Sequence, residues 1–205
     1  MVVIHYTAMV SAAAACDALC DPGRQVSAHY VIAEDGSVTA LVPEGLRAWH
    51  AGAGRWGAVT DVNSHSIGIE LANDGESPFA APLMDTLCDL LGGIMDRWAI
   101  RPERVIGHSD MAPGRKIDPG PKFDWRRLAL RGLSVWPKAA TADMADFAPM
   151  MRGFGYTATD DLDLLLDTFR RRFRPWATGP LDAADAGLIS DLARRFPVDA
   201  STHPA

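Results

Sequence analysis

The segment GHSDMAPGRKIDPGP, at Gly107–Pro121, carries an imidazole, an ammonium and a carboxylate on a loop that contains three prolines and three glycines. Such a loop is costly to order, and ordered loops on a rigid scaffold are where functional side chains gather. The apolar run Val105–Gly107 predicts a short buried strand, so His108 stands where that strand ends. A histidine and an aspartate presented in this way fit two ligands of a metal site.

The start of the chain supplies a candidate for the third ligand. The run VVIHYT at Val2–Thr7 is rich in β-branched residues and predicts a central strand that contains His5. Two neutral imidazoles and one carboxylate are a common ligand set for catalytic zinc, with the fourth position left to water. A histidine alone in a strand is more often a hydrogen-bonded structural residue. The interpretation of His5 as a ligand therefore depends on the loop at 108–118.

Five motifs of this chain resemble, in the same order, those of the zinc N-acetylmuramoyl-L-alanine amidases. They are HYT at 5–7, SAHY at 27–30, AWHAG at 48–52, SIGIEL at 66–71 and the loop at 107–121. Bacterial wall-recycling amidases, phage amidases and peptidoglycan recognition proteins share this amidase type. The resemblance extends from about residue 2 to about residue 137. It is closest to the branch that carries a small peptidoglycan-binding helical domain after the catalytic one.

The resemblance implies a role for five residues. His5, His108 and Asp118 match the zinc ligands, and zinc there polarises a carbonyl and lowers the pKa of bound water towards about 7. Glu70 matches the residue that moves protons, and Lys116 matches the cation that stabilises the oxyanion. The alternatives are an exposed edge carboxylate for Glu70 and an ordinary loop lysine for Lys116.

The resemblance also indicates which residues surround the reaction. Trp49, His50 and Ala51 resemble the wall of the substrate groove. The rings of Trp49 and Trp56 fit either stacking on a sugar or peptide, or packing in the core. His29 is expected to pack behind the metal and support a ligand.

Strand and helix patterns alternate along residues 1–137, which are expected to form the zinc amidase catalytic domain. Val26–Ala33 and Ser37–Val42 flank an Asp-Gly turn and predict a hairpin, while Pro82–Trp98 carries a helical apolar stripe. The predicted fold class is α/β, with a mixed central β-sheet covered by helices on both faces and followed by a small three-helix domain.

Residues 141–200 are expected to form that three-helix domain, because short motifs there resemble a peptidoglycan-binding domain. The helical patterns span Ala142–Arg152, Asp161–Phe173 and Asp182–Phe196, after a linker at Arg131–Thr141. The run Arg170–Arg174 predicts a solvated helix face.

The helical domain contains no expected catalytic residue and is interpreted as a wall anchor. Truncation after about Lys138 would then spare hydrolysis of a small muropeptide. The alternative is that the helices pack on the catalytic domain as structure and bury Phe147, Phe154 or Trp176 there.

The composition of the chain limits the kinds of partner that it is expected to bind. The 205 residues have a net charge of -6, which argues against a nucleic-acid partner. No apolar run approaches the roughly 20 residues of a membrane span. Met1 leads directly into a strand and not into a secretory signal, so a cytoplasmic monomer is expected, or a periplasmic or envelope protein if a leader lies upstream.

Two rival functions are weighed against an amidase. His108-Ser109-Asp110 also matches the His-x-Asp of the iron facial triad, but its third ligand would have to be His203, three residues from the end. A non-catalytic peptidoglycan-recognition module typically lacks a metal ligand, and here all three are present. The expected reaction is hydrolysis of the amide between N-acetylmuramic acid, or its 1,6-anhydro form, and L-alanine. The pattern leaves open whether the substrate is polymeric wall or a soluble muropeptide.

Overall fold

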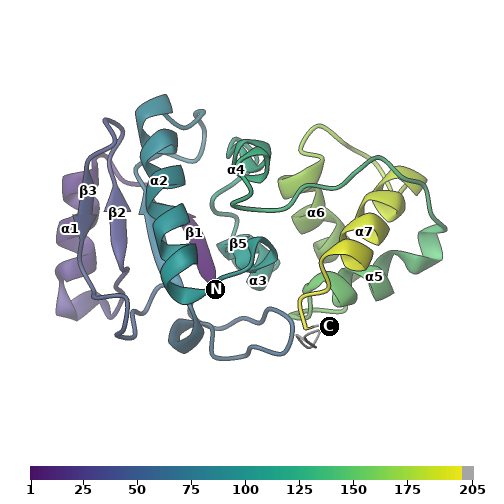
Figure 1. Cartoon of the computed structure of the whole chain (residues 1–205), viewed down its shortest axis with the longest axis horizontal. Helices are drawn as coiled ribbons and strands as arrows, with labels where there is room; N and C mark the ends of the chain where they lie inside the picture. Colours follow the sequence, from purple (N-terminus) through teal and green to yellow (C-terminus); the bar gives the residue numbers. More distant parts are fainter. Residues whose placement is uncertain (200–205) are drawn as a thin grey trace.

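The protein's structure, a computed structural model, describes residues 1–199 (Figure 1). The strands are β1 (Val2–Tyr6), β2 (Tyr30–Ile32), β3 (Val38–Ala40), β4 (Ile67–Leu71) and β5 (Val105–Gly107). The helices are α1 (Ala12–Cys20), α2 (Ala81–Trp98), α3 (His108–Met111), α4 (Trp125–Leu130), α5 (Phe147–Phe154), α6 (Leu162–Phe173) and α7 (Ala183–Arg195). Within residues 1–199, no helix combines the length and the apolar character that a membrane span requires.

The five strands form one mixed sheet in the order β3-β2-β4-β1-β5. β1 pairs in parallel with β4 and β5, β2 pairs in parallel with β4, and β2 and β3 pair antiparallel. The hairpin turns at the Asp-Gly step, where Gly36 has a φ of 89° that favours glycine. The predicted mixed α/β sheet is thus confirmed, with β1 next to its centre.

Alternation along β1 divides the interior of the protein into two layers. Val2 and Ile4 point into a core shared with α2, while Val3 points to the opposite face of the sheet. His5 follows in the same alternation and lies on the face of Val3. The sequence VVIHY therefore buries one face under α2, while the other face carries Val3 in a second core and His5 at the site.

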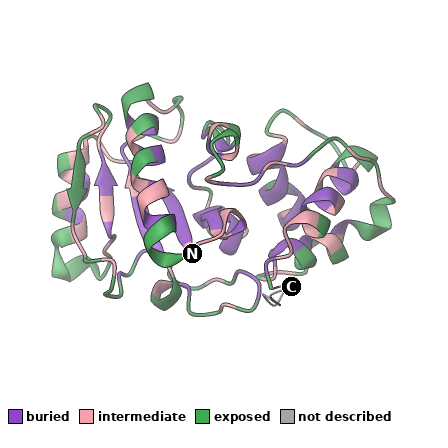
Figure 2. Ribbon diagram, viewed as in Figure 1, coloured by how far each residue is buried: buried purple, intermediate pink, exposed green. Residues whose placement is uncertain are grey.

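The C-terminal helices α5, α6 and α7 lie together beside α3 (Figure 1), and all three carry buried residues (Figure 2). They share a second hydrophobic core with β1 and β5. Val3 and Ile106 of the sheet belong to the same buried cluster as Phe147 and Phe154. Trp176, by contrast, is 71% exposed. The division of the chain near residue 140 therefore does not coincide with a boundary between two hydrophobic cores.

Two arginines of α6 do not lie on a solvated face, so that expectation is wrong for them. Arg170 and Arg172 are buried, and each pairs with a buried aspartate, Asp185 and Asp110 respectively. A charge this deep is tolerated only with a hydrogen-bonded partner. Helical periodicity predicted α6 but could not reveal partners that lie far away in sequence.

Candidate metal centre

The predicted site residues come together at the carboxyl ends of three neighbouring strands. His5 and Glu70 are register partners near the ends of β1 and β4, and their side chains leave the same face of the sheet. His108 begins α3 directly after β5, which pairs with β1 on its other side. In α/β sheets this edge is where ligands bind.

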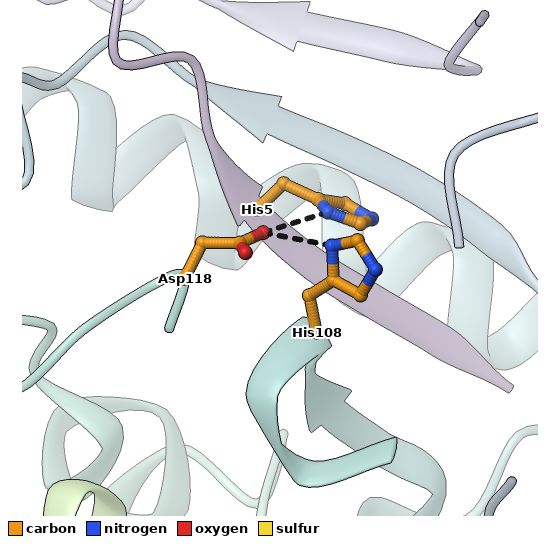
Figure 3. Close-up of side chains that lie close together, drawn as sticks. All are labelled: His5, His108 and Asp118. Carbon is orange, nitrogen blue, oxygen red and sulfur yellow. Dashed lines mark hydrogen bonds and ion pairs between the residues drawn. The ribbon is translucent and has the colours of Figure 1, made fainter. Parts of the chain in front are cut away.

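The two histidines and Asp118 converge on one point (Figure 3). Asp118 Oδ2 lies 2.9 Å from His5 Nδ1 and 3.1 Å from His108 Nδ1. One ligand atom from each residue lies within 4.8 Å of the other two, and all three residues are buried. This is the ligand set predicted from the sequence.

The partner of the outer nitrogen of His108 fixes the tautomer of that ring. His108 Nε2 lies 2.8 Å from the Ala51 carbonyl oxygen, which can only accept a hydrogen bond. Nε2 therefore carries the proton in a neutral ring, and the Nδ1 lone pair faces Asp118.

A longer chain of hydrogen bonds fixes the tautomer of His5. The Ser66 hydroxyl donates to the Val62 carbonyl oxygen at 2.5 Å and so accepts from His50 Nε2 at 3.2 Å. His50 Nδ1 is then an acceptor, and His5 Nε2 donates to it at 3.0 Å. His5 Nδ1 therefore also turns a lone pair to Asp118. Two lone pairs and a carboxylate around one point fit a bound cation.

His50 lies behind His5, on the side of its Nε2, and His29 lies behind His50. The ring of His50 packs directly on β4 at Gly68, where a Cβ would overlap it. His29 donates from Nε2 to the Leu46 carbonyl at 3.0 Å, and its Nδ1 accepts from the Gly68 N–H at 2.9 Å. His50, which was expected in the groove wall, is thus the residue that contacts His5. His29 lies one histidine further away.

The protonation states match those that metal ligation needs. Burial and the neighbouring His108 lower the pKa of His5 to about 4, against the opposing effect of Asp118. Burial by itself would raise the pKa of Asp118, but its contacts with His108 and His5 outweigh burial and hold that pKa below its usual range. At neutral pH, therefore, His5 is a neutral imidazole and Asp118 is ionised.

The surroundings of Glu70 shift its pKa to a range in which the carboxyl can exchange a proton near neutral pH. Burial, with the Asp118 carboxylate adding to it, raises the pKa of Glu70 to about 8, while Lys116 acts in the opposite direction. A cation at the site would also lower this pKa. Glu70 lines a mostly apolar pocket of about 180 Å³. The other lining residues are Tyr6, Thr7, Met9, Ala15, Ala18, Leu19, Arg24 and Val26.

Arg115, an exposed residue, links the 108–118 loop to the segment that contains Ala51. Its guanidinium donates to the Ala51 carbonyl at 2.7 Å and also to the Ala53 carbonyl. Ala51 therefore supports both Arg115 and His108 through its backbone. No sequence signal could have revealed this, because any residue carries the carbonyl that Ala51 uses.

The two tryptophans expected near the substrate groove differ in their exposure to solvent. Trp49 is 52% exposed, and its backbone pairs with Ser27, next to Val26 of the pocket. Trp56 is fully buried against Phe154 and Tyr156. Trp56 is therefore a core residue, and only Trp49 is free to meet a ligand.

The structure does not offer the carboxylate ligand that the iron facial triad requires. Asp110 does not face the site, because its oxygens accept hydrogen bonds from Tyr156 and Arg172. His203, the third ligand it would require, lies outside the described residues.

Fold and site together define an α/β protein with a candidate metal centre at the carboxyl edge of its sheet. The profile of a family described as N-acetylmuramoyl-L-alanine amidase matches residues 1–121. The Escherichia coli amidase AmiD is 32% identical over 237 residues, which cover 97% of this chain and 84% of that protein. The chain thus belongs to the N-acetylmuramoyl-L-alanine amidase family.

Solved structures agree with this membership along almost the whole chain. AmiD in complex with anhydro-N-acetylmuramic acid-L-Ala-D-gamma-Glu-L-Lys gives a TM-score of 0.88 over 97% of this chain and 90% of that one. AmpDH3 from Pseudomonas aeruginosa, in complex with anhydromuramic pentapeptide, is 31% identical with a TM-score of 0.87, over 96% of this chain and 92% of that one. The 1,6-anhydro-N-acetylmuramyl-L-alanine amidase AmpD of Haemophilus influenzae is 41% identical, but over only 50% of this chain and 56% of that protein.

Proposed function

We propose that this amidase uses one zinc ion, held by His5, His108 and Asp118, to hydrolyse the amide between the lactyl group of N-acetylmuramic acid and L-alanine in muropeptides. The substrate class includes the 1,6-anhydro form, since AmiD and AmpDH3 were solved with anhydromuramyl peptides. The observation that carries the proposal is the convergence of three ligand atoms beside Glu70, a half-buried residue in register with His5.

The chain's own residues divide the chemistry. Zinc, when bound, would act as a Lewis acid on the scissile carbonyl and on water. Glu70 takes the proton from the attacking water and returns it to the leaving amine of L-alanine, a use that suits its raised pKa. Lys116 is close enough to lower the pKa of Glu70, and its ammonium stabilises the negative oxygen of the tetrahedral intermediate.

The pocket beside Glu70 is proposed to receive one arm of the substrate. Its walls from α1, Ala15, Ala18 and Leu19, are small or apolar and suit the short side chains of a stem peptide. Trp49, whose backbone pairs with Ser27 next to Val26 of the pocket, offers an exposed ring on which a sugar can stack.

Product analysis with defined substrates tests the function. Purified protein is incubated with a muropeptide in its 1,6-anhydro and its reducing-sugar forms, and free stem peptide is measured. Release of a peptide with a new L-alanine amino terminus is expected. Binding of muropeptide without any such release would favour the non-catalytic recognition module.

The metal is tested by elemental analysis. Gently purified protein is expected to contain about one zinc per chain, as a three-ligand site implies. His108→Ala should reduce the content to a small fraction, because two ligands cannot hold the ion against buffer. The control is His65→Ala, since His65 is exposed and its ring contacts the Asp61 carbonyl and no metal ligand. Equal zinc in the two variants would contradict the ligand assignment.

Lys116→Ala should mainly affect the chemical step. An oxyanion partner acts in the transition state, so kcat should fall by roughly 100- to 1,000-fold while KM changes little. Lys122→Ala is the matched control, because Lys122 is an exposed lysine six residues further on. A rise in KM with kcat unchanged would make Lys116 a substrate-binding residue and not an oxyanion stabiliser.

The wall-binding role of residues 141–200 stays a prediction. Trp176 is exposed there and suits contact with a sugar ring. The same helices also complete the core of the catalytic part, which decides how a truncated protein behaves.

A further inference from the structure

The buried carboxylate of Asp110 joins the helical part of the chain to the turn that carries His108. Asp110 is 1% exposed and lies two residues after His108 in α3. Its Oδ1 accepts a hydrogen bond from the Tyr156 hydroxyl at 2.6 Å. Its Oδ2 accepts from Arg172 Nη1 at 2.5 Å and from the Gly107 N–H at 2.8 Å. Two of these three donors come from the helical part.

Arg172 also binds β5, the strand that ends directly before His108. Its Nη2 donates to the Val105 carbonyl at 3.1 Å and contacts Ser134 Oγ at 3.2 Å. The guanidinium carbon lies 4.0 Å from the ring centroid of Trp125, which faces it from α4. One side chain of α6 thus connects β5, α4 and the first turn of α3.

The turn at 155–157 reaches the other support of His108 as well. The Gly57 N–H donates to the Gly155 carbonyl at 2.8 Å, and Thr157 Oγ1 donates to the Gly57 carbonyl at 2.8 Å. Gly57 belongs to the segment 51–57, whose Ala51 carbonyl accepts from His108 Nε2. The helical part therefore holds the backbone that precedes His108. It also holds the segment that contains Ala51, the hydrogen-bond partner of His108 Nε2.

We propose that Tyr156 and Arg172 are positioning residues of the metal centre, which hold Asp110 and thereby fix the direction in which His108 presents Nδ1. The inference rests on the proposed metal-dependent function. α3 has only four residues, so its own hydrogen bonds cannot set its orientation. A buried carboxylate that loses a donor must shift or admit water, and either change would move the turn.

α6 provides a matched control two residues away. Arg170 pairs with Asp185 at 2.5 Å and donates to the Gly179 and Pro180 carbonyls. This pair is as buried as that of Arg172 and Asp110, but all its partners lie within the helical part. Damage to it should cost stability without reaching the metal.

The test uses the full chain and three variants, Tyr156→Phe, Arg172→Lys and Arg170→Lys. The Kd for Zn²⁺ is measured by competition with a chelator, Co²⁺ absorption reports ligand geometry, and the Tm of the metal-free protein reports stability. Tyr156→Phe removes one hydroxyl and should raise the zinc Kd by roughly 10- to 100-fold, as for other groups that orient metal ligands. Arg172→Lys should do the same and change the Co²⁺ spectrum.

At saturating zinc, both variants should lower kcat more than they change KM. Arg170→Lys should lower the Tm and leave the zinc Kd and the Co²⁺ spectrum as in the parent. The idea is wrong if Tyr156→Phe keeps the parent's zinc Kd and spectrum, or if all three variants lose zinc affinity in proportion to lost Tm. Zinc binding needs no muropeptide, so a parent that binds zinc without hydrolysis would contradict the proposed function alone.

Discussion

Glu70→Gln is expected to lower kcat severely while the protein stays folded and binds zinc. General acid–base help is worth roughly 100- to 10,000-fold, so kcat should fall by that factor. The amide has the shape of the carboxyl but neither accepts nor returns a proton. Zinc content should not change, because Glu70 is not among the residues whose ligand atoms converge.

The stability of this variant separates a catalytic from a structural role. The folded-state pKa of Glu70 is raised to about 8 in the absence of metal, so its ionisation opposes folding as pH rises above its unfolded value. Glu70→Gln should therefore have a Tm at pH 8 equal to or above that of the metal-free parent. Glu76→Gln, at an exposed position, serves as the activity control. Near-normal kcat in Glu70→Gln would remove it from the mechanism.

Truncation after Lys138 is expected to yield an insoluble or aggregating protein without activity on any muropeptide. The cut removes the side chains that share one buried cluster with Val3, Ile106 and Trp56, and so exposes part of this second core to water. It also removes Arg172 and Tyr156, leaving the buried Asp110 without two of its donors. Solubility, gel filtration and release of stem peptide measure the outcome.

This expectation reverses the one drawn from the sequence, in which the truncated enzyme stays active. A stop after Asp199 is the control, because it keeps α5, α6 and α7. A soluble truncated chain that hydrolyses a small muropeptide at the parent's rate would restore the anchor interpretation. Loss of sacculus binding alone would then assign the wall contact to the helices.

The sequence by itself determined the elements of the catalytic part and the ligand types. Alternation in VVIHY and the stripe in Pro82–Trp98 are local patterns, and they specify a strand and a helix without reference to distant residues. His5, His108 and Asp118 were identified through ligand chemistry and through motifs that resemble those of the amidases, and Glu70 through the same resemblance. These features depend on residue type and spacing along the chain.

Only the tertiary structure decided how those residues are held. The tautomer of His5 depends on Ser66, and the orientation of His108 depends on Asp110 with its partner Arg172. Helical spacing placed Arg172 on an exposed face, because spacing carries no information about a carboxylate 62 residues away. Burial turned that arginine from a solvated charge into a structural partner, since a buried charge must be paired. Such pairing is a property of the packed chain.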